Sequence, residues 1–97
     1  MGTVRVNGNT FSAQGEIGYD FAGEFASKCA RFIERHRGVP AVLDLTAARE
    51  LVSPCLTAVY EECRLHRPAE LTVVVRAHIA KLFEPGAMEK LYRLEVV

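Results

Sequence analysis

A short apolar strand followed closely by the start of a helix constrains this chain more than any other feature. The segment 41–46, Ala-Val-Leu-Asp-Leu-Thr, is nearly continuously apolar, which is typical of a strand buried on both faces of a sheet. After a short link, Ser53 and Pro54 begin the next stretch of helical periodicity. Serine is a preferred N-cap and proline suits the first helical position, so we expect a helix capped by Ser53. Open α/β domains place their working surface where a strand feeds a helix in this way.

A β-hairpin and a helix are expected before this junction. Alternating apolar residues flank Asn7-Gly8, a pair that favours a two-residue hairpin turn. Asp20 is expected to cap the helix that follows, and Gly38 and Pro40 to end it. This helix has one apolar face, formed by Phe21, Phe25, Cys29, Phe32 and Ile33.

Three further elements are expected after the junction helix, which should end near His66. Residues 71–75 are the clearest strand of the sequence, and a short helix follows that is broken at Pro85-Gly86. Residues 91–97 have strand character. This order predicts an α/β fold: a mixed, mainly parallel sheet of four to five strands, helices mainly on one face and an N-terminal β-hairpin.

Length, charge and cysteine content restrict the class of protein. The 97 residues fit a single domain, 1–97, with 49% hydrophobic residues for its core. With 12 basic and 12 acidic side chains the formal net charge is zero, which disfavours nucleic acid and anionic lipid as partners. We find neither a membrane-spanning run nor a secretory pattern, and the odd number of cysteines favours free thiols in a reducing compartment. We therefore expect a cytoplasmic protein that does not insert into a membrane.

The sequence offers no convincing metal or cofactor site. Cys63 and His66 form a Cys-x-x-His pair, but His36 and His78 belong to other elements, and a zinc site needs four ligands. The glycines form no phosphate-binding loop. We expect no metal and no cofactor.

Asp44 lies within the apolar strand and has two interpretations. It is either an acidic group at the active edge of the sheet or a structural residue that accepts backbone N–H groups of the following loop. The second is favoured, because a buried carboxylate must be hydrogen-bonded and the loop offers donors.

Several segments in order resemble the STAS family, the anti-sigma factor antagonist domain. The family's V-x-D-L-S strand resembles residues 42–46, and its D-S-S-G-L or D-T-G-G-L switch resembles residues 52–56, Val-Ser-Pro-Cys-Leu. Weaker similarities cover nearly the whole chain; they are Gly15-Glu16-Ile17, the strand 71–75, Leu82-Phe83 through Gly86, and Lys90-Leu91-Tyr92.

The resemblance implies a non-catalytic protein-interaction module of a bacterial regulatory system. Its partner would be an anti-sigma factor or a related serine kinase. The partner-binding surface that it implies consists of Gly18, Tyr19, Val52, Ser53, Pro54 and Cys55.

The switch departs from the family at each functional position. The phosphorylated residue of the family falls on Pro54, the preceding aspartate on Val52, the glycine on Cys55, and the aspartate of G-E-I-D on Gly18. Because proline has no hydroxyl group, phosphotransfer to Pro54 is chemically impossible. Ser53 is a second candidate for phosphorylation, set against its expected role as an N-cap.

Two other functions remain open. STAS domains of this length also serve as the small cytoplasmic subunit of ABC-type lipid transport complexes. The third hypothesis is a thiol-based enzyme or redox sensor that uses Cys55, since a helix N-terminus can lower the pKa of a thiol. A purely structural interpretation also stands, in which Ser53-Pro54 is only a helix start.

Overall fold

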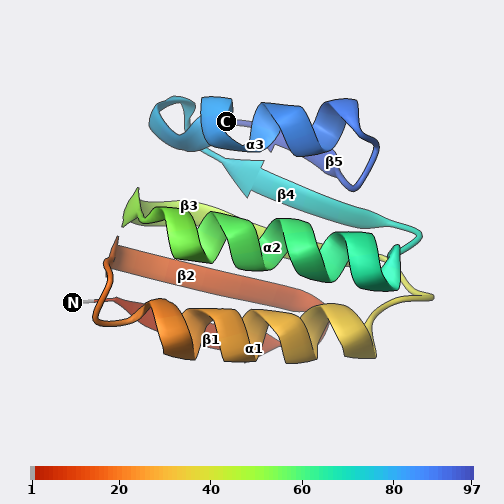
Figure 1. Cartoon of the computed structure of the whole chain (residues 1–97), viewed down its shortest axis with the longest axis horizontal. Coiled ribbons are helices and arrows are strands. Elements are labelled where there is room, and N and C mark those ends of the chain that lie inside the picture. The colour runs from red at the N-terminus through yellow and green to blue at the C-terminus, as the bar shows by residue number, and fades with distance from the viewer. Residues whose placement is uncertain (1) are drawn as a thin grey trace.

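The computed structural model, which describes residues 2–97, contains one five-stranded sheet in the order β1-β2-β3-β4-β5. β1 and β2 are antiparallel, and the other neighbours are parallel. Figure 1 shows α1, α2 and α3 in front of the sheet, so the helices cover one face. The predicted mixed, mainly parallel sheet is confirmed. The elements are β1 (Thr3–Asn7), β2 (Thr10–Ile17), α1 (Ala22–Arg35), β3 (Ala41–Leu51), α2 (Ser53–His66), β4 (Leu71–Val75), α3 (Ala77–Met88) and β5 (Arg93–Val96).

The N-terminal hairpin is present, but its turn lies one residue later than predicted. Asn7 is the last residue of β1 and pairs with Thr10, which leaves Gly8 and Asn9 in the turn. Gly8 has a φ of +60°, a conformation that glycine adopts without steric cost. The Asn9 side chain donates to the Pro40 carbonyl at 3.0 Å, so the turn is tied to the start of β3.

The α1 helix begins without the expected aspartate cap. Its N-cap residue is Phe21, and no side chain caps it, so the prediction for Asp20 was wrong. The N–H of Phe21 donates instead to the Gly18 carbonyl at 3.1 Å. The Ala22 N–H, which an Asp20 cap would have bound, donates to the Tyr19 carbonyl at 3.4 Å, so the chain enters α1 through a turn with main-chain acceptors. The apolar face of α1 is buried, as predicted.

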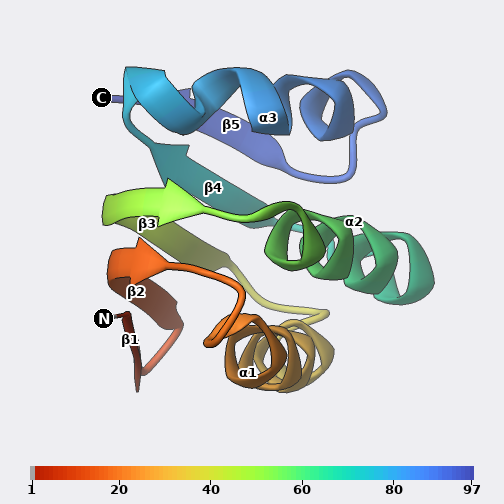
Figure 2. The same ribbon diagram turned by 60° about the vertical axis from the view of Figure 1, so that its left-hand side comes forward.

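β3 is longer and less enclosed than predicted. It runs to Leu51 because its second half continues to pair with β2, where two register shifts occur. The expected short link after residue 46 is therefore strand. Burial also alternates: Leu43 and Leu45 are buried, whereas Val42 is only partly buried. The prediction of a strand buried on both faces was wrong, because the helices cover only one face of the sheet (Figure 2).

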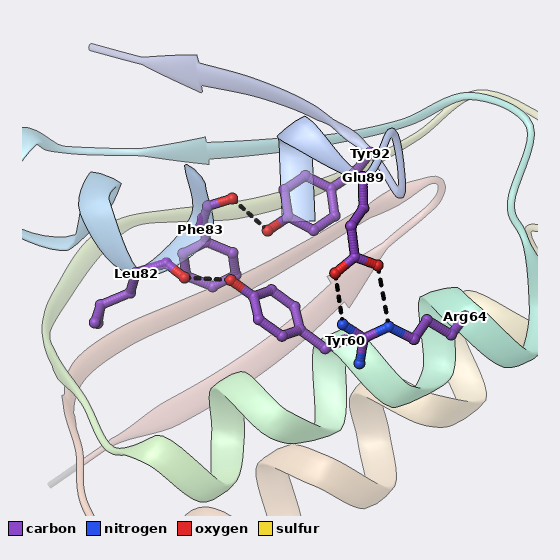
Figure 3. Close-up of polar contacts among 6 residues, drawn as sticks. All are labelled: Tyr60, Arg64, Leu82, Phe83, Glu89 and Tyr92. Atoms are coloured by element: carbon purple, nitrogen blue, oxygen red, sulfur yellow. Dashed lines mark hydrogen bonds and ion pairs between the residues drawn. The ribbon is translucent and has the colours of Figure 1, made fainter. Parts of the chain in front are cut away.

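α3 continues through Pro85 to Met88, where the sequence predicted a break at Pro85-Gly86. Proline removes one helical hydrogen bond, but in the last turns of this helix tyrosine hydroxyls reach the backbone carbonyls. Tyr92 donates to the Phe83 carbonyl at 2.6 Å, and Tyr60 donates to the Leu82 carbonyl (Figure 3). These bonds, from a turn and from α2, fasten the end of α3 to the rest of the domain.

Gly86 allows this arrangement because its missing side chain leaves room for an aromatic ring. A Cβ atom built at Gly86 would lie 2.2 Å from the Tyr92 hydroxyl oxygen. Beside this contact, Arg64 of α2 donates to both carboxylate oxygens of Glu89, at 2.8 and 3.2 Å (Figure 3). The region formed by Tyr60, Arg64, Gly86, Glu89 and Tyr92 is called the tyrosine lock below.

Candidate functional site: the β3–α2 junction

The site begins where β3 joins α2 with one residue between them. Leu51 at the end of β3 pairs with Ile17 of β2, and the Val52 N–H donates to the Ile17 carbonyl at 3.1 Å. Val52 is the N-cap residue of α2, with φ −77° and ψ 158°. Ser53 is thus already helical and Pro54 is the second helical residue, one position later than predicted. The hydroxyl of Ser53 makes no capping hydrogen bond, so its expected role as N-cap was wrong.

Exposed and buried side chains alternate at this junction. Ser53 and Pro54 are exposed, whereas Val52 and Cys55 are buried in the hydrophobic core. The pyrrolidine ring therefore stands at the accessible rim of the domain. The buried side chains of Val52 and Cys55 anchor this turn to the core.

The first turn of α2 offers few donors to an anion. Pro54 has no N–H group, and the Cys55 N–H already donates to the Val52 carbonyl at 3.0 Å. A helix N-terminus usually binds phosphate through just such N–H groups. This geometry makes the junction a poorer cradle for a phosphate than an ordinary helix start.

The β2–α1 loop lies next to the junction, as the Val52–Ile17 hydrogen bond requires. Gly18 is partly buried and directly follows Ile17. Tyr19 is 73% exposed, an unusual position for a large aromatic side chain. The structure therefore brings Tyr19, Ser53 and Pro54 to the same edge of the sheet, the carboxyl end of the parallel strands.

Arg76 and His78, at the start of α3, belong to this edge and were not predicted. β4 pairs with β3 only as far as Asp44, so later carbonyls of β3 need other donors. Arg76 donates to the Thr46 carbonyl, and His78 donates through Nε2 to the Ala48 carbonyl, both at 3.1 Å. The sequence could have predicted Arg76 and His78 at this site from their position directly after the strand 71–75, because the carboxyl ends of parallel strands meet at one edge of the sheet.

Asp44 is a structural residue on the uncovered face of the sheet. Its Oδ1 accepts the Thr46 N–H at 3.0 Å and the Thr46 hydroxyl at 2.7 Å. The favoured interpretation, that Asp44 satisfies nearby donors, agrees with this geometry. The donors come from the strand itself and not from a loop, because β3 continues beyond Thr46.

The three cysteines are buried free thiols. Burial raises the pKa of Cys55 to about 11 and that of Cys63 to about 12, and it also raises the pKa of Cys29. A lowered pKa of Cys55 was expected for a thiol enzyme, and the structure gives the opposite direction. Desolvation of the thiolate outweighs the effect of the helix N-terminus, so Cys55 lacks both the access and the ionisation of a reactive cysteine.

Neither a metal cluster nor a membrane-spanning helix is found among residues 2–97. No group of three or more His, Cys, Asp and Glu side chains is arranged to hold a metal ion within this range. His66 lies instead beside Glu62, with Nε2 and Oε1 3.5 Å apart, while Cys63 is buried. No helix in the same part of the chain has the length and apolar character to cross a bilayer.

Comparison with known proteins supports the fold through structure alone. No family model and no curated protein matches the sequence. A solved structure that does match is the crystal structure of an anti-sigma factor antagonist from Mycobacterium paratuberculosis, with 18% sequence identity and a TM-score of 0.71. The match covers 98% of this chain and 84% of that chain. The domain thus has the fold of an anti-sigma factor antagonist, the STAS fold that the sequence motifs predicted.

Proposed function

We propose that this chain is a cytoplasmic protein-interaction module of a bacterial regulatory system, which binds an anti-sigma factor or a related serine kinase. The observation that carries the proposal is the exposed Pro54 at the mouth of the β3–α2 junction, beside the exposed Ser53 and Tyr19. The shared fold supports a role in protein binding. The proposed surface consists of Gly18, Tyr19, Val52, Ser53, Pro54 and Cys55.

Tyr19 is the proposed anchor of this surface. An exposed tyrosine supplies a large contact area at low conformational cost, and tyrosines are enriched among the residues that dominate binding energy. Ser53 and Pro54 supply direct contacts, whereas the buried Val52 and Cys55 fix the shape of the turn.

Binding at this surface is proposed to be independent of phosphorylation. Pro54 cannot accept a phosphate, and its ring removes one of the N–H donors that would hold a phosphate on Ser53. A domain without the acceptor would keep its partner through shape, with no charge-based release.

Mass spectrometry after incubation with a family-type serine kinase and ATP tests the phosphorylation step. We expect an unchanged mass for the wild type and a gain of one phosphate for Pro54→Ser, because that substitution restores a hydroxyl at the exposed position. The double variant Ser53→Ala/Pro54→Ser should still gain the phosphate. A wild-type phosphate located on Ser53 would contradict the proposal.

Binding to the same kinase tests the surface itself. We expect Tyr19→Ala to weaken binding about tenfold or more, because a central tyrosine typically contributes over 1–2 kcal/mol at an interface. Leu65→Ala is the matched control, since Leu65 on α2 is 71% exposed and lies at the other end of that helix from Pro54. Equal effects of the two substitutions would show that the surface has been placed wrongly.

Co-purification from the native host separates this proposal from the transport alternative. A kinase-like or sigma-associated protein is expected; an ATPase subunit of an ABC-type lipid transporter would identify the second function. For the thiol hypothesis, alkylation of Cys55 at neutral pH is expected to be as slow as that of Cys29 and Cys63, because all three are buried.

A further inference from the structure

A groove with an apolar floor lies between β1 and α1, away from the β3–α2 junction. It has a volume of about 320 Å³ and is lined by Val4, Val6, Lys28, Arg31, Phe32, Arg35 and His36. Val6 is 50% exposed although it is a β-branched apolar residue on the helix-covered side of the sheet. The groove thus combines an apolar floor with a cationic rim.

The groove exists because three helices do not reach over all five strands. α1 packs over β2, where Phe25 and Phe32 contact the Phe11 ring at centroid distances of 5.5 and 5.6 Å. Val4 and Val6 pair with Ala13 and Phe11 and therefore face the same side of the sheet. Only the flank of α1 lies beside them, so their side chains are incompletely covered.

β1 also has a free backbone edge. It is the first strand in the sheet order, and within the described residues 2–97 it pairs with β2 alone (Figure 2). In an antiparallel pair every second residue directs its N–H and C=O groups away from the partner strand. An extended segment could therefore hydrogen-bond to β1 and place alternate side chains in the groove.

The charge at the rim indicates what such a segment carries. Lys28 is paired with Glu24 at 3.0 Å, but the ion pairs found among residues 2–97 include neither Arg31 nor Arg35. Both arginines are exposed on α1, in a chain whose formal net charge is zero. Two arginines beside an apolar floor are complementary to an extended segment with apolar side chains flanked by carboxylates.

We propose that β1 and α1 form a second docking surface, on which an acidic, extended segment of a partner protein adds to the sheet as an additional strand. Its apolar side chains lie over Val4, Val6 and Phe32, and its carboxylates pair with Arg31 and Arg35. A second copy of this chain fits poorly, because pairing two β1 strands would bring the cationic flanks of two α1 helices together. The surface is separate from the one around Tyr19 and Pro54, so it goes beyond the function proposed above.

A synthetic peptide, fluorescein-Glu-Thr-Val-Thr-Ile-Thr-Glu-amide, tests this docking surface on the full chain. In a strand, the two glutamates, the valine and the isoleucine of this peptide lie on one face. We expect saturable binding by fluorescence anisotropy at about 50 mM salt, weakening as salt is raised. Arg31→Gln/Arg35→Gln should weaken binding about tenfold, and Val6→Thr about threefold. The control Arg49→Gln/Lys81→Gln, which removes two exposed charges elsewhere, should change it less than about twofold.

Hydrogen exchange reports whether the peptide adds as a strand. Amides of β1 that point away from β2 should exchange about tenfold more slowly when the peptide is bound, because they become paired. Peptide binding without this protection would overturn strand addition. Equal binding of a polyglutamate peptide, or of a version with lysine in place of glutamate, would overturn the combined apolar and acidic preference.

The oligomeric state tests whether a second copy of this chain occupies the β1 edge. Sedimentation equilibrium at about 0.1 mM should give a monomer, since like charges oppose pairing of two copies. A dimer whose formation protects the same β1 amides would show that the occupant is a second copy and would overturn the proposal. Failure of the peptide to bind at about 1 mM would also overturn it, while leaving the kinase test of the Tyr19 surface unaffected.

Discussion

The two ends of α2 differ in how their polar and aromatic groups are used. At the N-terminal end, Ser53 and Pro54 are exposed and the serine hydroxyl makes no capping bond. Toward the C-terminal end, Tyr60 and Arg64 are engaged by α3 and by Glu89, which follows α3. The tyrosine lock therefore holds α2 in place through one end, while the side chains of Ser53 and Pro54 at the other end stay exposed. Substitutions in the lock should alter stability, and substitutions of the exposed junction residues Ser53 and Pro54 should alter binding with little effect on stability.

The largest expected effect comes from filling the space at Gly86. Gly86→Ala would place a Cβ atom within 2.2 Å of the Tyr92 hydroxyl oxygen, which forces the ring away and breaks its bond to Phe83. We expect the free energy of unfolding to fall by about 2–3 kcal/mol, measured by urea denaturation. Gly23→Ala in α1 is the control, because its added Cβ atom has no neighbour within 4 Å among the described residues, apart from the adjoining residues and the backbone of its own helix. That variant should gain about 0.5–1 kcal/mol, and a similar gain for Gly86→Ala would contradict the proposed role of the lock.

A smaller effect is expected when the lock loses one hydroxyl group. Tyr92→Phe removes the donor to the buried Phe83 carbonyl, which is 2.6 Å from the hydroxyl oxygen. We expect a loss of about 1–2 kcal/mol in the free energy of unfolding, because a buried acceptor is left unpaired. Tyr60→Phe should cost less, since its bond to Leu82 is exposed to water. If Tyr60→Phe lowered the thermal stability more than Tyr92→Phe, the hydrogen bond from α2 would contribute more to the lock than the bond from the turn after α3.

The buried thiols give stability a dependence on alkaline pH. Burial raises the pKa of Cys55 to about 11 and that of Cys63 to about 12, whereas unfolded thiols ionise near their ordinary value of 9.0. Stability is thus fully present below about pH 9 and falls above it, as the unfolded chain loses protons that the folded chain retains. Each such thiol should remove about 1 kcal/mol between pH 9 and pH 10.

The variant Cys63→Ala isolates this effect. Its free energy of unfolding should fall by about 1 kcal/mol less than that of the wild type between pH 9 and pH 10. Between pH 7 and pH 8 the two proteins should show the same pH dependence, whatever the cost of the smaller side chain. Parallel curves across the alkaline range would show that Cys63 does not carry a raised pKa.

The smallest expected effect on stability lies at the junction. Ser53→Ala should change the free energy of unfolding by less than about 0.5 kcal/mol, because the hydroxyl does not cap α2. A true N-cap serine would cost about 1 kcal/mol on removal, so a loss of that size would restore the original interpretation of Ser53. The two ends of α2 would then differ less than the structure indicates.

The sequence predicted the order of elements well and their boundaries less well. The strand at residues 71–75 and the end of α2 at His66 were located correctly, because periodicity and the following Pro68 are local signals. The predictions for the end of β3, for the N-cap of α1 and for a break in α3 were wrong. In two of these cases a residue outside the element decided the outcome: Ile17 paired with Leu51, and Tyr92 donated to the Phe83 carbonyl. At α1 a local backbone turn onto the Gly18 carbonyl replaced the expected Asp20 cap.

The residues of the candidate site were predicted through motif resemblance, and the structure added their surroundings. It brings Tyr19 and Pro54 to one edge and adds Arg76 and His78, which bond to β3. Neither residue formed a motif with the junction, because hydrogen bonds to main-chain carbonyls require no particular sequence spacing. The groove beside β1 could not be predicted from the sequence either, because it depends on how far α1 extends over the sheet.

The amino-acid sequence by itself determined the kind of domain and one chemical limit, because apolar periodicity selects helices and strands and a proline at position 54 can never carry a phosphate. The tertiary structure alone decided which groups meet water. Cys55 and Ser53 are two residues apart, yet packing of α2 against the core buries the thiol and leaves the hydroxyl exposed. The exposure and the pKa of a side chain are properties of the folded chain, because they depend on every element packed around that side chain.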